Sequence, residues 1–346
     1  MKLASPPSAR DATVVVLFGG RSSERDVSLA SGAAVATALR DVGDGRGPAR
    51  VVTVEIAASG VWILEAEKHS PEEALSRLPR EAVYFLALHG GEGEDGTIQG
   101  LLGATGRAHT GSGVAASALC MTKSWTRAVL AQAGLRVAPG HAIDAAQWAS
   151  ARGAALDLAR SLSSSGFVVK PDRGGSSVAT FVLDGAEGLE PAIETVLATG
   201  DRALVEARIV GSECTVGVLG NRGHAAALMP VEIVPKEGRF FDYEEKYNAG
   251  GASEHCPPRG IDESMCAVLR ELAERAHRAT DCEGQSRVDF IVPRSGGAPV
   301  VLEINTLPGM TARSLLPLAA LQAGLSYRDL CLHLVGLARE RVGASR

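Results

Sequence analysis

Two short runs near the C-terminal end constrain the fold of this chain most, because each alternates polar and apolar residues. Side chains on a β-strand point alternately to opposite faces, with a period of two residues. In the first run Arg287 and Asp289 therefore share a face, and in the second run Glu303 and Asn305 do. The segment 293–299 between the runs is rich in turn formers. The runs predict a hairpin with these four polar side chains on one face and four apolar ones on the other: Val288, Phe290, Leu302 and Ile304.

The polar face of this hairpin predicts a metal site. Asp289 and Glu303 supply carboxylates and Asn305 supplies an amide oxygen, and such an oxygen-only set suits Mg²⁺ that also holds a nucleotide's phosphates. A solvated strand face with a salt bridge is the alternative. The Pro308-Gly309 turn favours the metal site, because backbone N–H groups there can face a bound anion. We therefore expect a site of phosphoryl transfer.

The size and composition of the chain narrow its class. Its 346 residues exceed what one hydrophobic core usually serves, so about two or three domains are expected. A net charge of −5 and an aromatic content of 4% disfavour a nucleic-acid binder. The six cysteines form no CxxC pair, which indicates reduced thiols. The sequence shows neither an apolar leader nor a long apolar run, so we expect a cytoplasmic protein without a membrane partner.

Residues 1–118 are expected to form an α/β domain. A helix is predicted at 27–39, and short apolar runs predict buried strands at 13–18, 51–56 and 83–88. Strands that alternate with helices are typical of a parallel sheet. Such sheets bind ligands at the loops that follow their strands, which here are 19–24 and 89–96.

A central domain at 119–206 and a C-terminal domain at 207–346 complete the expected organisation. The central domain is predicted to have helices at 121–134 and 145–163 and strands at 167–171, 179–183 and 203–206. The C-terminal domain is predicted to have strands at 215–219 and 229–233, a helix at 263–280 and the hairpin. The polar stretch 235–258 shows no pattern of secondary structure. A loop of that length in a compact domain suits a lid.

Three further segments could carry chemistry, each with a plainer alternative. Lys170 ends a predicted strand and precedes a Gly/Ser loop that could cradle a phosphate; the loop is no Walker A motif and could be a simple turn. Glu206 and Glu213 could accept hydrogen bonds from ribose hydroxyls or lie on a solvated strand end. Lys246-Tyr247 lies in the long polar stretch, which is either an exposed loop or a lid that excludes water from an activated intermediate.

Taken together, these segments resemble the D-alanine–D-alanine ligase family of the ATP-grasp superfamily. The resemblance covers nearly the whole chain in the expected order. The segments that carry it are 19–28, 89–96, 110–113, 121–123, 170–177, 241–247 and 305–315, of which the last two are the most specific. It implies a three-domain ATP-grasp fold whose N-terminal α/β domain has a parallel sheet.

The resemblance also implies a reaction and a set of site residues. ATP phosphorylates the carboxylate of one D-alanine, and the amine of a second D-alanine attacks the acyl phosphate. ATP would be bound by Lys123, Lys170, Ser177, Glu206, Glu213 and Lys246. Two Mg²⁺ (or Mn²⁺) ions would be held by Asp289, Glu303 and Asn305. The oxyanion would be stabilised by Arg287 and the Gly309 N–H, and the second substrate's carboxylate would be bound by Ser314 and Leu315.

The first substrate would be bound by Glu24, with His89 nearby. Glu24, Ser176 and Tyr247 resemble the family's hydrogen-bonded triad that joins the lid to this pocket. Relatives that make a D-alanyl–D-lactate ester lack the tyrosine, so Tyr247 favours an amine as the second substrate.

The sequence departs from the family's pattern at three places. Ala207-Arg208 stands where a lysine or glutamate and an aromatic are frequent near the adenine. Cys282-Glu283-Gly284 replaces the usual Cys-Arg-Gly, and Arg313 adds a cation beside Ser314.

The sequence leaves two other functions open. One is a paralogue with the same chemistry on another D-amino acid, such as D-serine, or on an antibiotic intermediate, for which Arg313 is the only support. The other is an ATP-binding regulatory module without catalysis, which predicts the loss of a catalytic group that this sequence retains. The resemblance further suggests a homodimer and a role in peptidoglycan precursor synthesis.

Overall fold

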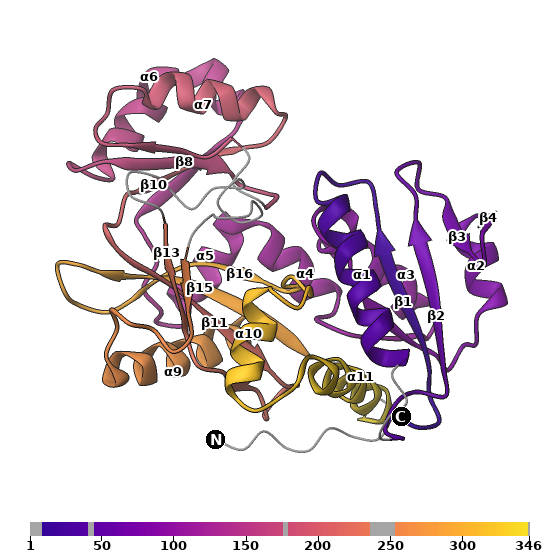
Figure 1. The fold of residues 1–346 in the computed structure, drawn as a ribbon. Coiled ribbons are helices and arrows are strands. Elements are labelled where there is room, and N and C mark those ends of the chain that lie inside the picture. The colour runs from indigo at the N-terminus through magenta and orange to yellow at the C-terminus, as the bar shows by residue number, and fades with distance from the viewer. Residues whose placement is uncertain (1–8, 41–44, 176–178, 236–252, 345–346) are drawn as a thin grey trace.

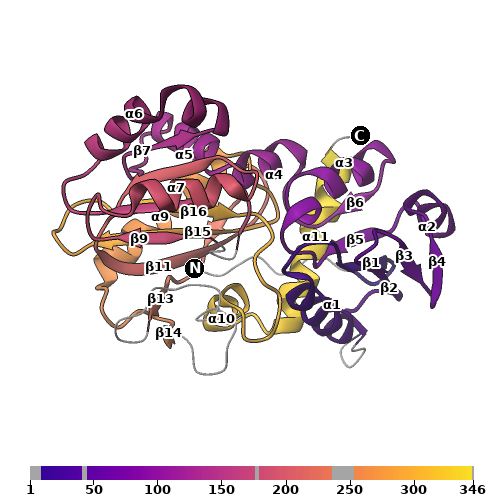
Figure 2. The same cartoon turned by 90° about the horizontal axis from the view of Figure 1, so that it is seen from above.

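The computed structural model describes residues 9–40, 45–175, 179–235 and 253–344. Three β-sheets form three lobes, with the N-terminal lobe beside the other two (Figure 1). Seen from above, the C-terminal helix lies along the side of the N-terminal lobe that faces the other sheets (Figure 2). Within the described ranges, no helix has both the length and the apolar character needed to cross a bilayer.

The N-terminal sheet has the strand order β4-β3-β2-β1-β5-β6. Pairing is parallel from β2 through β1 and β5 to β6, which confirms the predicted parallel sheet. Its strands are β1 (Thr13–Gly19), β2 (Arg50–Ile56), β3 (Trp62–Leu64), β4 (Glu67–His69), β5 (Val83–Leu86) and β6 (Ala108–His109). Its helices are α1 (Arg25–Arg40), α2 (Pro71–Arg77), the 3₁₀ turn η1 (Gly91–Gly93) and α3 (Thr97–Ala104).

The antiparallel β3–β4 hairpin was not expected from the sequence. Its two turn residues, Glu65 and Ala66, both have positive φ (53° and 68°). Two-residue hairpin turns of this kind usually carry Asn or Gly at these positions, so Glu-Ala gave no turn signal. Strands of three residues are also too short to show a period of two.

The central sheet is antiparallel, with the order β7-β10-β8-β9. Its elements are β7 (Gly140–Ile143), α6 (Ala145–Ser161), β8 (Phe167–Pro171), β9 (Phe181–Leu183), α7 (Leu189–Ala198) and β10 (Ala203–Ala207). Helices α6 and α7 cover one face (Figure 1) and share a core with it that includes Leu156, Ile193 and Val205. These two helices do not cover the opposite face of the central sheet.

The third sheet has the order β14-β13-β11-β15-β16, with β12 paired to β11. Its strands are β11 (Gly211–Leu219), β12 (Ala226–Ala227), β13 (Val231–Val234), β14 (Ser253–His255), β15 (Gln285–Pro293) and β16 (Val300–Asn305). Helix α9 (Glu263–Ala279) packs Leu269 and Ala273 against Val216 and Phe290 on one face. Helices α4 (Val114–Met121) and α5 (Lys123–Gln132) lead into the central sheet and contact β16.

Three local expectations are wrong. The helix expected at 121–134 is interrupted at Thr122, which is extended (φ −102°, ψ 98°) and bridges to Arg173, so α4 and α5 are separate. The stretch 235–258 contains strand β14, which is too short for a periodic pattern. Leu302 is absent from the core, because the register shifts after Asp289 and places Val301 opposite Phe290.

The C-terminal helix α11 (Tyr327–Ala344) returns to the N-terminal lobe. Leu330, Leu334 and Val335 are buried in one core with Val14 of β1 and Val35 of α1. Helix α10 (Leu315–Gln322) precedes α11 and packs against β11 of the third sheet. The end of the chain therefore ties the first lobe to the third, across the expected domain boundaries.

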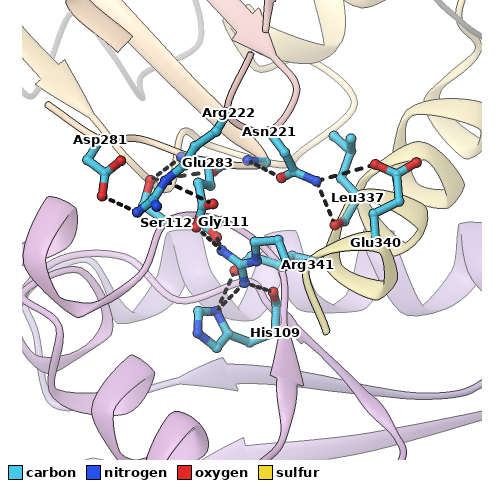
Figure 3. Close-up of polar contacts among 12 residues, drawn as sticks. His109, Gly111, Ser112, Asn221, Arg222, Asp281, Glu283, Leu337, Glu340 and Arg341 are labelled. Carbon is cyan, nitrogen blue, oxygen red and sulfur yellow. Dashed lines mark hydrogen bonds and ion pairs between the residues drawn. The ribbon is translucent and has the colours of Figure 1, made fainter. Parts of the chain in front are cut away.

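A polar network reinforces this junction (Figure 3). The Arg341 guanidinium donates to the carbonyl oxygens of His109 (2.5 Å) and Gly111 (2.5 Å) and pairs with Glu283 (3.2 Å). The Asn221 amide donates to the Leu337 carbonyl at 2.9 Å. These bonds connect four segments that lie far apart in sequence. Glu283, which departs from the family's pattern, is one of the connected residues.

Stability should fall on mild acidification because His277 is buried in the third lobe. Its Nδ1 lies 2.7 Å from Ser286 Oγ, and burial is the main cause that lowers its pKa from 6.5 to about 4. The unfolded chain takes up this proton near pH 6.5 and the folded chain only near pH 4. Between these values the unfolded state binds more protons, so the free energy of unfolding falls as the pH falls, by up to about 3 kcal/mol.

Urea unfolding at about pH 7 and about pH 4.5 measures this loss. His277→Gln cannot take up the proton, and we expect its stability to change less between the two pH values. An unchanged pH dependence in the variant would contradict this origin. His109, whose pKa burial also lowers to about 4, supplies a second contribution in the same range.

Candidate active site

The predicted hairpin forms as β15 and β16, with its polar residues on one face of the third sheet. Asp289 pairs directly with Glu303, and Arg287 with Asn305. Thr215 of β11 lies opposite Asp289 on the other side. The same face therefore carries the expected metal ligands in adjacent rows, while the apolar face packs on α9.

The Asp289 carboxylate is held by neighbours on this face. Thr215 donates to its Oδ1 at 2.5 Å, and Arg287 donates to Oδ1 (2.9 Å) and Oδ2 (2.8 Å). A carboxylate has about four lone-pair positions, so these bonds leave one position on Oδ2. Thr215 was not singled out in the sequence, where its only signal is its position on a strand two residues after Glu213.

A buried cluster of charges links the central sheet to this face. Lys170 of β8 pairs with Glu206 of β10 at 2.8 Å, and Arg127 of α5 contacts the other Glu206 oxygen at 3.2 Å. Lys123 of α5 approaches Glu303 at 4.0 Å. Four of these side chains are nearly buried, and Glu303 is partly exposed. The two expected phosphate lysines thus lie between an expected nucleoside ligand and an expected metal ligand.

The two lysines differ in their electrostatic surroundings. Burial lowers the pKa of Lys123, and the nearby Glu303 charge opposes that shift only in part. Burial acts on Lys170 as well, but the charges of Glu206 and Glu303 outweigh it and raise its pKa. The carboxylates therefore favour the charged form of both lysines, more strongly at Lys170.

Arg127 belongs to this cluster, although the sequence did not predict a role for it. It lies four residues after Lys123 on α5, so both side chains project from the same side of the helix. Its guanidinium also donates to the Ala138 carbonyl. The spacing of Lys123 and Arg127 was a usable signal, but a cation pair on a helix is more often solvated than buried.

Glu24 lies in the N-terminal lobe, where the Gly174-Gly175 loop of the central lobe approaches it. A Cβ built on Gly90 would lie 2.7 Å from Glu24 Oε2, and one on Gly175 would lie 3.4 Å away. The carboxylate is therefore close to the backbone of both loops. His89 precedes Gly90 and is buried, with Nε2 3.1 Å from Ser31 Oγ and Nδ1 3.8 Å from Glu94.

The segment after the hairpin brings Gly309 against Ser314. A Cβ on Gly309 would lie 2.9 Å from Ser314 Oγ, so a larger residue would displace that hydroxyl. Ser314 Oγ accepts from the Thr311 N–H at 3.1 Å and does not cap α10, which begins at Leu315. The first N–H groups of α10 therefore receive no bond from this side chain.

Of the remaining expected site residues, Glu213 is placed by the structure and four others are not described. Glu213 lies on the same face as Thr215, between Ile233 and Ile291. Ser176, Ser177, Lys246 and Tyr247 lie outside the described residues. Within the described part of the chain no cluster of three His, Cys, Asp or Glu side chains suited to a metal occurs, and the expected ligand set includes an asparagine.

Two antiparallel sheets with buried lysines beside an acidic strand face, next to a lobe with a parallel sheet, are the architecture of an ATP-grasp protein. The chain belongs to the D-alanine–D-alanine ligase family. The family model described as D-ala D-ala ligase C-terminus matches residues 129–336, and the one described as D-ala D-ala ligase N-terminus matches residues 13–81.

Known proteins resemble this chain over nearly its full length. It is 42% identical to a D-alanine--D-alanine ligase of Desulforudis audaxviator, over 94% of this chain and 98% of that one. A ligase of the same name from Anaeromyxobacter dehalogenans is 43% identical, with 92% and 94% covered.

Solved structures agree with the sequence relatives. The D-alanine-D-alanine ligase from Coxiella burnetii has a TM-score of 0.79 at 28% identity, covering 97% of this chain and 96% of that one. The VanG D-Ala:D-Ser ligase from Enterococcus faecalis has the same score and identity, with 95% and 99% covered. The expected fold and family are confirmed.

Removal of Glu206 should destabilise the protein strongly. Glu206→Leu leaves Lys170 and Arg127 buried without their common partner, and breaking a buried pair in this way costs about 3–5 kcal/mol. Thermal unfolding should show a clearly lowered midpoint. Arg152→Ala is the matched control, because its pairs with Glu190 and Glu194 are about half exposed and should contribute less than about 1 kcal/mol. Equal losses in the two variants would contradict this account of the cluster.

Proposed function

We propose that this chain joins two D-alanine molecules into D-alanyl-D-alanine with hydrolysis of ATP to ADP and phosphate. One observation carries the proposal: the acidic hairpin face lies beside Lys123 at 4.0 Å, while the loop after Lys170 reaches Glu24. A phosphate held by the lysines would lie between a metal site and an amino-acid site. The family membership of the chain supports the same reaction.

ATP is bound between the central and third sheets in this proposal. Lys123 and Lys170 hold its phosphates as point charges, and Lys246 and Ser177 complete the phosphate site. Glu206 and Glu213 bind the nucleoside, and Glu206 exchanges part of its pairing with Lys170 and Arg127 for that contact.

The donor set of the hairpin fits Mg²⁺ or Mn²⁺. Asp289, Glu303 and Asn305 present two carboxylates and an amide oxygen on adjacent positions of one face, and all are hard oxygen ligands. Glu303, which pairs with Asp289, would contribute an oxygen ligand to both ions. When bound, the ions offset the charge of the β- and γ-phosphates.

The reaction proceeds in two steps. The carboxylate of the first D-alanine attacks the γ-phosphorus of ATP, which gives an acyl phosphate and releases ADP. The neutral amine of the second D-alanine attacks the acyl carbon, and the tetrahedral intermediate collapses with release of phosphate, which carries away the proton that the nitrogen loses. Arg287 and the Gly309 N–H stabilise the oxyanion of that intermediate, which requires Arg287 to turn part of its donor set away from Asp289.

The two amino acids are bound on opposite sides of this centre. Glu24 takes the ammonium group of the first, with His89 behind it and Ser176 and Tyr247 completing a bonded triad. Ser314 and the Leu315 N–H take the carboxylate of the second at the start of α10, where a helix N-terminus favours an anion.

The wider setting follows from the family. Three domains at 1–118, 119–206 and 207–346, a lid at about 235–258, a homodimer and a cytoplasmic location are part of the proposal. The product would serve peptidoglycan precursor synthesis. The VanG relative is described as a D-Ala:D-Ser ligase, so a different second amino acid is the alternative that the first experiment must test.

Phosphate release from ATP with Mg²⁺ tests the function directly. We expect release with D-alanine alone, with a dipeptide detected by mass, and none with L-alanine. D-Serine and D-alanine with D-lactate are the comparison substrates, and Tyr247 predicts no ester product. Release only with another amino acid would move the protein to a specialised pathway. Measurable ATP binding with no release for any pair would favour a regulatory module.

Arg287→Met should abolish most of the activity without loss of nucleotide binding. Removal of an oxyanion donor typically lowers kcat by about 10²–10³-fold, while the lysines that hold phosphate remain. Steady-state kinetics and calorimetric titration with ADP separate the two effects. Arg294→Lys is the control, because Arg294 lies exposed in the turn of the same hairpin. A kcat within about threefold of the unmodified enzyme would exclude the proposed role.

A further inference from the structure

Asp172 is a fully buried carboxylate that the proposed reaction does not use. Its exposed fraction is 0%, and it follows strand β8 two residues after Lys170. The Ser124 N–H donates to its Oδ1 at 2.7 Å, and the Ser124 hydroxyl donates to its Oδ2 at 2.8 Å. Arg202 donates to Oδ2 as well. A buried charge with three donors indicates a specific structural task.

That task concerns the first turn of α5. The helix has no side-chain cap of its own, because Thr122 at its N-cap position makes no capping bond. Its first N–H groups lack acceptors within the helix. The Asp172 carboxylate, from a distant part of the chain, is the acceptor for one of them, the Ser124 N–H. A negative charge at this end also interacts favourably with the helix dipole. Asp172 thus replaces a local N-cap residue.

The backbone of Asp172 joins the same turn. The Lys123 N–H donates to the Asp172 carbonyl oxygen at 2.8 Å, and the Lys123 ammonium donates to the Gly174 carbonyl at 2.5 Å. Both the backbone N–H and the ammonium group of Lys123 are therefore bonded to the loop that follows β8. Ser124, which binds the Asp172 side chain, is the next residue along α5.

We propose that Asp172 is a positioning residue for ATP: its carboxylate fixes the first turn of α5 to the end of β8 and so sets Lys123 beside Lys170 for the nucleotide's phosphates. The inference rests on the proposed function, because it takes the two lysines as phosphate ligands. Loss of the carboxylate removes both of its bonds to Ser124 and loosens the first turn of α5, so that Lys123 is less well positioned for the phosphates.

Two substitutions give a graded test. Asp172→Asn keeps an acceptor for the Ser124 N–H but removes the charge that pairs with Arg202, and Asp172→Ala removes every contact of the carboxylate. We expect the KM for ATP and the Kd for ADP to rise about tenfold in the alanine variant and by a smaller factor in the asparagine variant. The KM for D-alanine should stay unchanged.

Asp201→Asn is the matched control. Its carboxylate accepts from the N–H groups of Arg173 and Arg202 in the same junction, and neither of these residues lies on α5. We expect its KM for ATP to equal that of the unmodified enzyme. Arg202→Met is a further variant for the case in which both Asp172 variants fail to fold, because Arg202 is partly exposed and its loss removes one donor from Asp172 and one from the Ser124 hydroxyl.

The outcomes separate positioning from general structural damage. A lowered kcat with unchanged KM for ATP and Kd for ADP would mean that only the folded fraction had changed, and it would overturn the proposal. So would an equal rise in the KM values for ATP and D-alanine. Absence of phosphate release in the unmodified protein would instead refute the proposed ligase function, and ADP titration would still test Asp172.

Discussion

The buried ion pairs that join two strands of the central sheet to helix α5 are the interaction on which the site depends. Lys170, Glu206 and Arg127 come from two strands and a helix, and each is nearly removed from water. Burying a charge costs several kcal/mol unless a partner is well placed. The elements that carry them are therefore fixed relative to one another, and the pairing selects this arrangement over alternatives that leave one charge alone. A nucleotide entering here meets charges that are already held in position.

The N-terminal lobe is attached to this centre through the end of the chain. Helix α11 contributes to the core of the first sheet, and Arg341 holds the loop at His109 and Gly111. A Cβ on Gly111 would lie 2.8 Å from the Leu307 side chain, and the Leu307 N–H donates to Asn305 Oδ1 at 2.9 Å. A continuous set of contacts thus runs from α11 to an expected metal ligand, so the lobe that holds Glu24 is tied to the hairpin.

The sequence could predict those parts of the fold that repeat with a regular period. The Arg287–Asn305 hairpin follows from alternation alone, and the parallel sheet follows from apolar runs between helices. The position of Leu302 could not be predicted, since a bulge changes the register without changing composition. The same limit applies to Arg127 and Asp172, because their roles depend on which distant residues they meet. Helix α11 shows the same limit at larger scale, since the elements it packs against, α1, β5 and β6, lie far from it in sequence.

The glycines explain why the candidate site can nevertheless be recognised in the sequence. Gly90 and Gly175 both bring backbone within a few ångströms of Glu24, and Gly309 does the same at Ser314. A side chain at Gly90 would meet the Glu24 carboxylate, and one at Gly309 would meet the Ser314 hydroxyl. Groups of the main chain therefore lie close to the proposed ligand positions, and their placement requires glycine at fixed distances from a few polar residues. That spacing is a property of the sequence itself, so it can be recognised before the lobes are assembled. The contacts between lobes, which set the electrostatic surroundings and the position of each polar side chain, arise only when the chain is folded.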